Sequence, residues 1–325
     1  MPEKTMRDAI NEALHQAMEQ DESVFVIGED VAGCNGSAGD VGSVGGVFGV
    51  TSGIYNRWPD RCVDTPISES AIVGAAAGAA LVGMRPVAEI MFADFIGVCM
   101  DQIVNQMGKF RYMFGGKSRC PAVIRFASGG GFSAAGQHSQ AMYQVMTSFP
   151  GLKVVVPSNA YDAKGLMLTA IQDDDPVLFF EPKILYQETA EVPDEMYTIP
   201  FGEANFVREG DDVTVVAFGQ MVPKAAAVID ALHPRAPVHT WCPDTIEAWA
   251  PPEPAHEAPQ LAVIAVVHLS VAFPESDQAR AQTPLFGSSN RLESQSGQNQ
   301  NPGPSITDNA PLLLPVLRLE THRHP

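Results

Sequence analysis

Residues 61–92, RCVDTPISESAIVGAAAGAALVGMRPVAEIMF, contain a strand pattern, a helix of small apolar residues and a second strand pattern in direct succession. We predict strands at 61–64 and 86–92 around a helix at 68–84. The alternation continues on both sides, with strands predicted at 24–28, 121–127, 153–156 and 176–181 and helices at 95–113, 137–148 and 159–172. Strand and helix alternation requires crossover connections, so the predicted fold class is α/β with a doubly wound, mainly parallel sheet.

The region before the first predicted strand has the apolar spacing of a helix. The apolar residues that recur on one helical face are Met6, Ile10, Leu14 and Met18. This amphipathic pattern differs from the basic and apolar regions of a signal peptide, so we expect no secretory leader. The apolar-leaning run Leu261–Phe273 is shorter than the about 20 residues that a membrane helix needs. We therefore expect a cytoplasmic protein without a membrane partner.

Composition excludes several other classes of protein. The chain has 325 residues, a net charge of −18 and 45% hydrophobic residues, which is enough to bury the cores of two ordinary domains. An excess of acidic residues argues against nucleic acid as a partner, because binding to phosphates needs Lys and Arg. The five cysteines form no CxxC pair and no cluster with His, which favours indifferent thiols in a reducing compartment.

Acidic residues follow three of the predicted strands. Glu29 and Asp30 close VFVIGED, Glu69 lies in DTPISES, and Asp94 lies in IMFADF. Ligands of parallel sheets bind beyond the carboxyl ends of the strands, so each of these carboxylates is either a site residue or a cap of the next helix. Glu69 has apolar and small neighbours, including Ile67, and burial among them would raise its pKa.

His138 lies in the loop sequence SAAGQHSQ after a run of glycines at 129–131. A histidine in a polar loop before a helix fits a site residue better than a core residue. The glycine-rich stretches at 42–50 and 115–118 lack the spacing of a phosphate loop, and no metal-ligand cluster or nucleophile elbow is present.

The domain pattern changes along the chain. We predict a first domain at 1–185, a Pro-punctuated linker at 186–200 and a second α/β domain at 201–325 that begins with DDVTVVAFG and MVPKAAAVIDAL. From residue 233 the pattern fails, and we expect 233–325 to be atypical and partly irregular. A reading-frame error in the coding sequence and genuine divergence both explain this change, and the sequence does not choose between them.

An ordered series of motifs resembles one known family. The motifs are GEDV at 28–31, RCVDTPISE at 61–69, RPVAEIMFADF at 85–95, DQIVNQ at 101–106, AAGQHSQ at 134–140 and PGLKVVVPSNAYDAKGL at 150–166. They resemble the beta subunit of the thiamine-diphosphate-dependent component of 2-oxo acid dehydrogenase complexes. GGVFGVTSGI at 45–54 and KFRYMFGGK at 109–117 are most similar to the acetoin dehydrogenase branch.

The resemblance implies a transketolase-type pyrimidine-binding domain followed by a transketolase-type C-terminal domain, and it gives roles to matching residues. Glu69 would hydrogen-bond the aminopyrimidine of thiamine diphosphate, Phe95 would stack on that ring, and Ile67 would line it. Glu29 would belong to a proton path between paired sites, and His138 would face the reacting carbon. A structural potassium site would use the positions Ala170, Ile171, Asp173 and Asp175.

The thiamine signature that holds the diphosphate through magnesium, Gly-Asp-Gly followed some 30 residues later by Asn, is missing from the chain. The resemblance implies that an alpha subunit supplies it in an α2β2 heterotetramer, which docks on a lipoyl acyltransferase core. The expected reaction is cleavage of acetoin, or decarboxylation of a 2-oxo acid such as pyruvate, with transfer to lipoamide. The alternative is a non-catalytic or defective paralogue that binds an alpha subunit without turnover.

Overall fold

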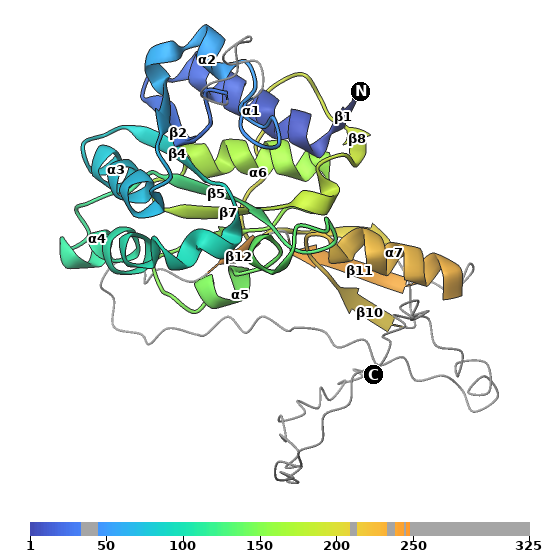
Figure 1. Ribbon diagram of the computed structural model, residues 1–325. Helices are drawn as coiled ribbons and strands as arrows, with labels where there is room; N and C mark the ends of the chain where they lie inside the picture. The colour runs from blue at the N-terminus through green and yellow to red at the C-terminus, as the bar shows by residue number, and fades with distance from the viewer. Residues whose placement is uncertain (34–44, 209–212, 233–237, 244, 248–325) are drawn as a thin grey trace, which may run out of the picture. The chain divides into compact units, whose positions relative to one another are not determined.

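The fold is built on one seven-stranded sheet. The computed structural model describes residues 1–33, 45–208, 213–232, 238–243 and 245–247 (Figure 1). The spatial order is β12-β6-β7-β5-β4-β2-β3, and every pair is parallel except β12 with β6. The strands are β2 (Val24–Glu29), β3 (Cys62–Thr65), β4 (Arg85–Ile90), β5 (Val123–Ser128), β6 (Lys153–Val155), β7 (Val177–Pro182) and β12 (Thr245–Glu247). The predicted mainly parallel α/β sheet is confirmed.

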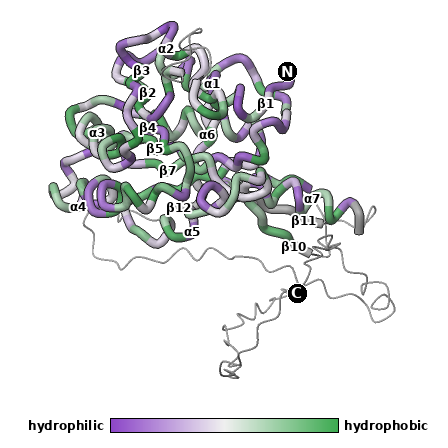
Figure 2. Tube along the Cα trace, in the orientation of Figure 1, coloured by the Kyte–Doolittle hydropathy of each residue, from purple (hydrophilic) through white to green (hydrophobic). Residues whose placement is uncertain are grey.

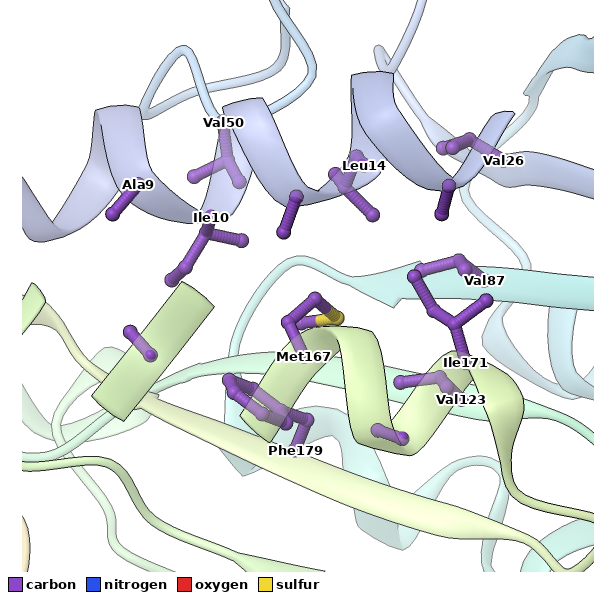
Figure 3. Packing of buried hydrophobic residues seen from close by; sticks show 14 of the residues in the cluster. Ala9, Ile10, Leu14, Val26, Val50, Val87, Val123, Met167, Ile171 and Phe179 are labelled. Atoms are coloured by element: carbon purple, nitrogen blue, oxygen red, sulfur yellow. The ribbon is translucent and has the colours of Figure 1, made fainter. Parts of the chain in front are cut away.

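Helices cover both faces of this sheet. On one face α1 (Met6–Gln20) packs against α6 (Ala160–Gln172), and Figure 3 shows Leu14 and Ile10 opposite Met167 above the strand residue Phe179. The whole predicted stripe of α1 is buried. The other face is covered by α3 (Glu69–Leu81), the short helices η2 (Ala93–Gly97) and η3 (Gln102–Met107), and α5 (Tyr143–Met146). Hydrophobic colouring accordingly concentrates around the central strands in Figure 2.

Two predicted helices are shorter than expected. The segment 95–113 is divided into η2, the π-helical η3 and α4 (Gly108–Met113). The segment 137–148 contains only η4 (Gly136–His138) and α5. The amide of Gln140, which would continue a helix, instead donates to the carboxylate of Asp94 at 3.3 Å. Long-range bonding therefore replaces the helical bond at this position.

The N-terminus is tied to a distant segment. β1 (Glu3–Thr5) pairs antiparallel with β8 (Thr189–Glu191), within the predicted linker. The next residues of that linker are held by Lys164, whose ammonium donates to the carbonyl oxygens of Pro193 at 2.6 Å and Glu195 at 3.0 Å. The segment 186–195 is therefore fixed to the first domain.

The start of the second domain forms its own three-stranded sheet. β9 (Ala204–Arg208), β10 (Val213–Val216) and β11 (Val238–Pro243) have the order β10-β11-β9, and α7 (Met221–Leu232) follows β10. Within the region predicted to be atypical and partly irregular, β11 and β12 (Thr245–Glu247) are regular strands. The β-branched and aromatic residues of VHTWCP favour a strand, and its proline stands at the last position. The rest of 233–325 lies outside the described residues.

The sequence predicts no segment that spans a membrane, and the length and hydropathy of the helices can be compared with that prediction. Within the described ranges, no helix is both long and apolar enough to cross a membrane.

Candidate functional site

The predicted site residues follow the carboxyl ends of neighbouring strands. Glu29 ends β2, Glu69 follows β3, Phe95 follows β4 and His138 follows β5. Because β3, β2, β4 and β5 are adjacent and parallel, these residues are placed in sequence along one edge of the sheet. The topology thus brings together residues that lie up to 109 positions apart in the chain.

His138 lies against two aromatic rings. The centre of its imidazole is 4.4 Å from the ring centre of Phe92 and 5.5 Å from that of Phe95, and both contacts are edge to face. Phe92 and Phe95 also contact each other, at 6.1 Å. No residue in the described ranges hydrogen-bonds the imidazole nitrogens, which leaves both of them to a bound molecule. The structure therefore joins His138 and Phe95 in one aromatic cluster.

The loop that carries His138 contains strained backbone. Ser133 and Ala135 have φ values of 56° and 60°, in the left-handed region that residues with a Cβ seldom adopt. The loop is held at its end by Asp94, whose carboxylate accepts from the amide of Gln140 at 3.3 Å. Strained residues persist only where the surroundings hold them, and such residues cluster at functional sites. Asp94 is thus a support of the loop, and neither a helix cap nor a direct partner of His138.

Glu29 lies within a group of carboxylates. Burial raises its pKa, and the negative charges of Asp30, Glu69, Glu89 and Asp64 raise it further. Asp64 itself accepts a hydrogen bond from the amide of Ala32 at 3.2 Å. A carboxyl group with a raised pKa can bind and release a proton at a pH closer to neutral than a free glutamate can. Within this group, burial and neighbouring negative charges thus favour the protonated form of Glu29.

Glu69 is the first residue of α3 and is half-buried. The start of α3 is tied to the segment after β4 by the Ser70 hydroxyl, which donates to the carbonyl oxygen of Val98 at 2.6 Å. The charge of Glu69 contributes, after burial, to raising the pKa of the neighbouring Cys99 thiol to about 12. Glu69 is therefore close to the segment that carries Phe95.

The expected apolar enclosure of Glu69 is wrong for this chain alone. Ile67 is 74% exposed, and Pro66 is exposed as well. Apolar residues on the strand-to-helix turn point outward because the turn projects beyond the end of the sheet. A partner surface over this turn would complete the enclosure, whereas the described residues of the chain leave it open.

The residues present fit the pyrimidine half of thiamine diphosphate. An aminopyrimidine needs a carboxyl group for its ring nitrogen and an aromatic face to stack on, and Glu69 and Phe95 supply these groups from neighbouring turns. The described ranges hold no cluster of three or more His, Cys, Asp or Glu arranged for a metal ion.

The predicted potassium positions do not fit a metal ion. The carbonyl oxygens of Ile171 and Asp173 each accept from the guanidinium of Arg85 at 2.9 Å. The Asp173 carboxylate is bound by Lys153 at 2.7 Å, and the Asp175 carboxylate is bound by Arg111 at 2.6 Å. The carbonyl oxygen of Ala170 accepts from the amide of Asp173 at 3.3 Å. Protein donors already bind all of these oxygens, a backbone amide in the case of Ala170 and side-chain cations in the others, so we assign no potassium to the group.

A buried charge network beneath the site was not predicted. The Arg125 guanidinium on β5 donates two hydrogen bonds to Glu181 on β7, at 2.7 and 2.8 Å, and one to Glu89 on β4, at 2.7 Å. The hydroxyl of Tyr186 donates to Glu181 at 2.6 Å. Charged residues inside strands that are otherwise apolar, as in VIRFAS and VLFFEP, are the sequence signal for such a network.

Fold and site together define an α/β domain whose candidate site residues lie beyond the carboxyl ends of a parallel sheet. Residues 2–189 match the family described as transketolase, pyrimidine binding domain, and the chain belongs to this family. The resemblance found in the motifs is thereby confirmed.

Relatives of known name are similar to this chain in sequence. The acetoin:2,6-dichlorophenolindophenol oxidoreductase subunit beta of Cupriavidus necator is 58% identical over 217 residues, which cover 67% of this chain and 64% of the relative. The subunit of the same name from Bacillus subtilis is 54% identical over 236 residues, or 71% of this chain and 68% of the relative. The 2-oxoisovalerate dehydrogenase subunit beta of Bacillus subtilis is 46% identical over 227 residues, or 69% of this chain and 66% of the relative. The chain thus spans about two thirds of the length of these relatives.

Solved structures support the fold. A split gene transketolase, described as an inactive beta4 tetramer, has a TM-score of 0.56 at 23% identity and covers 73% of this chain and 70% of its own. The transketolase from Leishmania mexicana has a TM-score of 0.56 at 16% identity, with coverage of 77% and 35%. At these identities the likeness concerns the fold alone.

Proposed function

We propose that the chain is the beta subunit of a thiamine-diphosphate-dependent dehydrogenase component that cleaves acetoin with an alpha subunit and passes the two-carbon fragment to lipoamide. The observation that carries the proposal is the convergence of Glu69, Phe95 and His138 at one edge of the sheet. Acetoin is the preferred substrate because the 58% and 54% identical relatives carry that substrate in their names. Decarboxylation of a 2-oxo acid is the related reaction of the more distant relatives.

Thiamine diphosphate, when bound, would supply a nucleophilic carbon and, separately, an electron sink in its thiazolium ring. Glu69, the first residue of α3, would hold the proton shared with the pyrimidine ring nitrogen. Phe95 would fix the plane of the ring. His138 would orient the substrate oxygen and exchange a proton with it through its free nitrogens. Glu29 and its neighbouring carboxylates would carry protons toward a paired site.

Exposed apolar residues support a shared site. Ile67 is 74% exposed and Phe132, on the loop of His138, is 53% exposed. We infer that an alpha subunit covers these side chains and contributes the magnesium and diphosphate contacts that the chain's sequence lacks. A lipoyl acyltransferase core would be the second partner of the resulting α2β2 assembly.

The test is dye-linked acetoin oxidation with the chain, an alpha subunit, thiamine diphosphate and magnesium. Glu69→Gln retains the shape of the side chain but cannot hold the shared proton, so we expect a loss of about 100- to 10,000-fold in kcat. The matched control is Glu22→Gln, an exposed carboxylate before β2 at the other end of the sheet, which should leave the rate unchanged. Full activity of Glu69→Gln would contradict the mechanism. Stable pairing with the alpha subunit without any turnover would favour the non-catalytic paralogue.

A further inference from the structure

Lys183 is a buried lysine that the proposed chemistry does not use. It directly follows β7 and begins the short helix η5 (Lys183–Leu185), and only 1% of its surface is exposed. Lysine is seldom buried to this extent, because its ammonium group loses its hydration unless protein groups replace the water. The partners that replace the water therefore indicate what the side chain does.

Those partners are the two ends of the loop that carries His138. The Lys183 ammonium donates to the carbonyl oxygen of His138 at 2.7 Å and also to the carbonyl oxygen of Gly129. The amide of Gly129 in turn donates to the carbonyl oxygen of Gln140 at 3.0 Å, which closes the loop at its base. One cation thus bridges two backbone positions that are nine residues apart.

The loop also packs against Ile184, the residue after Lys183. Gly131 has a φ of 94°, and a Cβ atom at this position would lie 2.7 Å from Cδ1 of Ile184. The strained residues Ser133 and Ala135 lie between the two carbonyl groups that Lys183 bridges. A strained loop keeps one conformation only while its ends are held, and Lys183 and Ile184 provide that support from below.

The same ammonium lies beside the aromatic cluster. It is 5.7 Å from the ring centre of Phe92, whose ring contacts the imidazole of His138 at 4.4 Å. Burial lowers the pKa of Lys183, while the negative charge of Asp94 raises it. Lys183 therefore contacts the backbone of His138 and the ring against which the imidazole packs, without touching the imidazole itself.

We propose that Lys183 is a positioning residue that bridges the two ends of loop 129–140 and thereby keeps the imidazole of His138 between Phe92 and Phe95. The catalytic consequence rests on the function proposed above. The structural part, that this one cation holds this loop, is independent of any activity.

Lys183→Met is the decisive variant, because methionine retains much of the buried volume but cannot donate a hydrogen bond. Lys164→Met is the matched control: Lys164 is also fully buried and also donates to backbone carbonyl oxygens, those of Pro193, Asp194 and Glu195. Its contacts hold the segment after β8, away from His138. Both variants lose hydrogen bonds from a buried ammonium to backbone carbonyl oxygens, and Lys164→Met also loses the ion pair of Lys164 with Glu12 at 3.2 Å.

The first measurement is amide hydrogen exchange of the full chain, alone and with an alpha subunit. In Lys183→Met we expect exchange in 129–140 to accelerate about 10- to 100-fold, since each lost bond to a charged donor corresponds to roughly one factor of ten or more. In Lys164→Met only the segment 192–200 should accelerate. Lys183→Arg retains a buried cation with several donors and should stay within about threefold of the parent chain in 129–140.

The second measurement is steady-state kinetics in the dye assay. Misplacement of His138 should lower kcat about 10- to 100-fold in Lys183→Met while KM changes less than about twofold, since substrate binding does not need the exact position of the imidazole. Lys164→Met should retain the parent kcat. Unchanged exchange in 129–140 of Lys183→Met, or equal acceleration in Lys183→Arg, would overturn the proposal. If the parent mixture reduces no dye, the proposed function fails, whereas the exchange pattern still decides the role of Lys183.

Discussion

Replacing Arg125 with methionine tests the buried charge network most directly. The residue is 2% exposed, and its side chain is bonded to Glu181, which is fully buried, and to Glu89. Methionine fills much of the space but leaves two carboxylates in the core without their cation. The hydroxyl of Tyr186 would remain as a partner of Glu181.

The expected loss of stability is large. Removing one member of a buried ion pair costs about 3 to 5 kcal/mol, because the charge left behind has no opposite charge and little water to compensate it. For a chain of this size, that corresponds to a fall in Tm of about 6 to 20 °C, at about 2 to 4 °C per kcal/mol. This loss of stability should be smaller at acidic pH. Burial already raises the pKa of Glu89, while the charge of Arg125 opposes that rise.

The sign of the pH dependence follows from this pKa. A carboxyl group whose pKa is higher in the folded state binds its proton more tightly there, so folding is favoured below the ordinary glutamate range and penalised as the pH rises through the raised pKa. Loss of Arg125 raises the pKa of Glu89 further. The deficit of Arg125→Met relative to the parent chain should therefore be larger at pH 8 than at pH 5.

The assay is urea and thermal unfolding followed by circular dichroism at both pH values. Arg111→Met is the matched control, because Arg111 makes an ion pair of similar length with Asp175 at 2.6 Å but is 40% exposed. Surface pairs contribute about 0 to 1 kcal/mol, so this variant should lose little. The reasoning would be refuted if the two variants lost the same stability, or if the deficit of Arg125→Met did not depend on pH.

Two further predictions concern glycines and cysteines. Gly78→Ala in α3 should raise stability by about 0.5 to 1 kcal/mol, because no atom lies within 4 Å of the added Cβ and alanine favours a helix. Gly165→Ala in α6 should instead lower stability, since its Cβ would lie 2.6 Å from Cγ1 of Ile199 and overpacking costs about 1 to 3 kcal/mol. Thermal unfolding of both variants checks this, and a shift of Tm in the same direction would contradict one of the two predictions. Burial raises the pKa of the Cys62, Cys99 and Cys120 thiols to about 12, so iodoacetamide at pH 8 should label them in urea but not in the native chain, as peptide mapping would show. Rapid labelling of any of the three in the native chain would show that its thiol is accessible.

The strands could be predicted well because their signal is local. The central strands are mainly apolar runs, each with one or two charged residues, between turn residues, as expected for a parallel sheet covered on both faces. The helix predicted at 137–148 failed because its hydrogen bonds depend on Asp94, which lies 46 residues from Gln140. Periodicity in one segment carries no information about such a partner.

Some residues of the candidate site could likewise be predicted from the local sequence, and others could not. Glu29, Glu69 and His138 could be found because polar residues after predicted strands are conspicuous. The network of Arg125 and Glu181 could not be assembled, because its members are 56 residues apart and pair only through the strand register. Lys183 has the sequence context of an ordinary surface lysine after a strand. Only the folded structure shows that Lys183 is buried, because the loop that follows β5 packs over its side chain.

The pairing of β1 with β8 has a consequence for synthesis on the ribosome. Glu3 is opposite Glu191, and the apolar face of α1 packs on α6, so the first helix has no complete partner until nearly the whole domain has been translated. At about 5 to 20 residues per second, this interval is roughly 10 to 40 s. During that time the apolar face of α1, which begins at Met6, is exposed to chaperones and to neighbouring nascent chains. α1, which is synthesised before the other helices of this domain, is thus among the last of them to be buried.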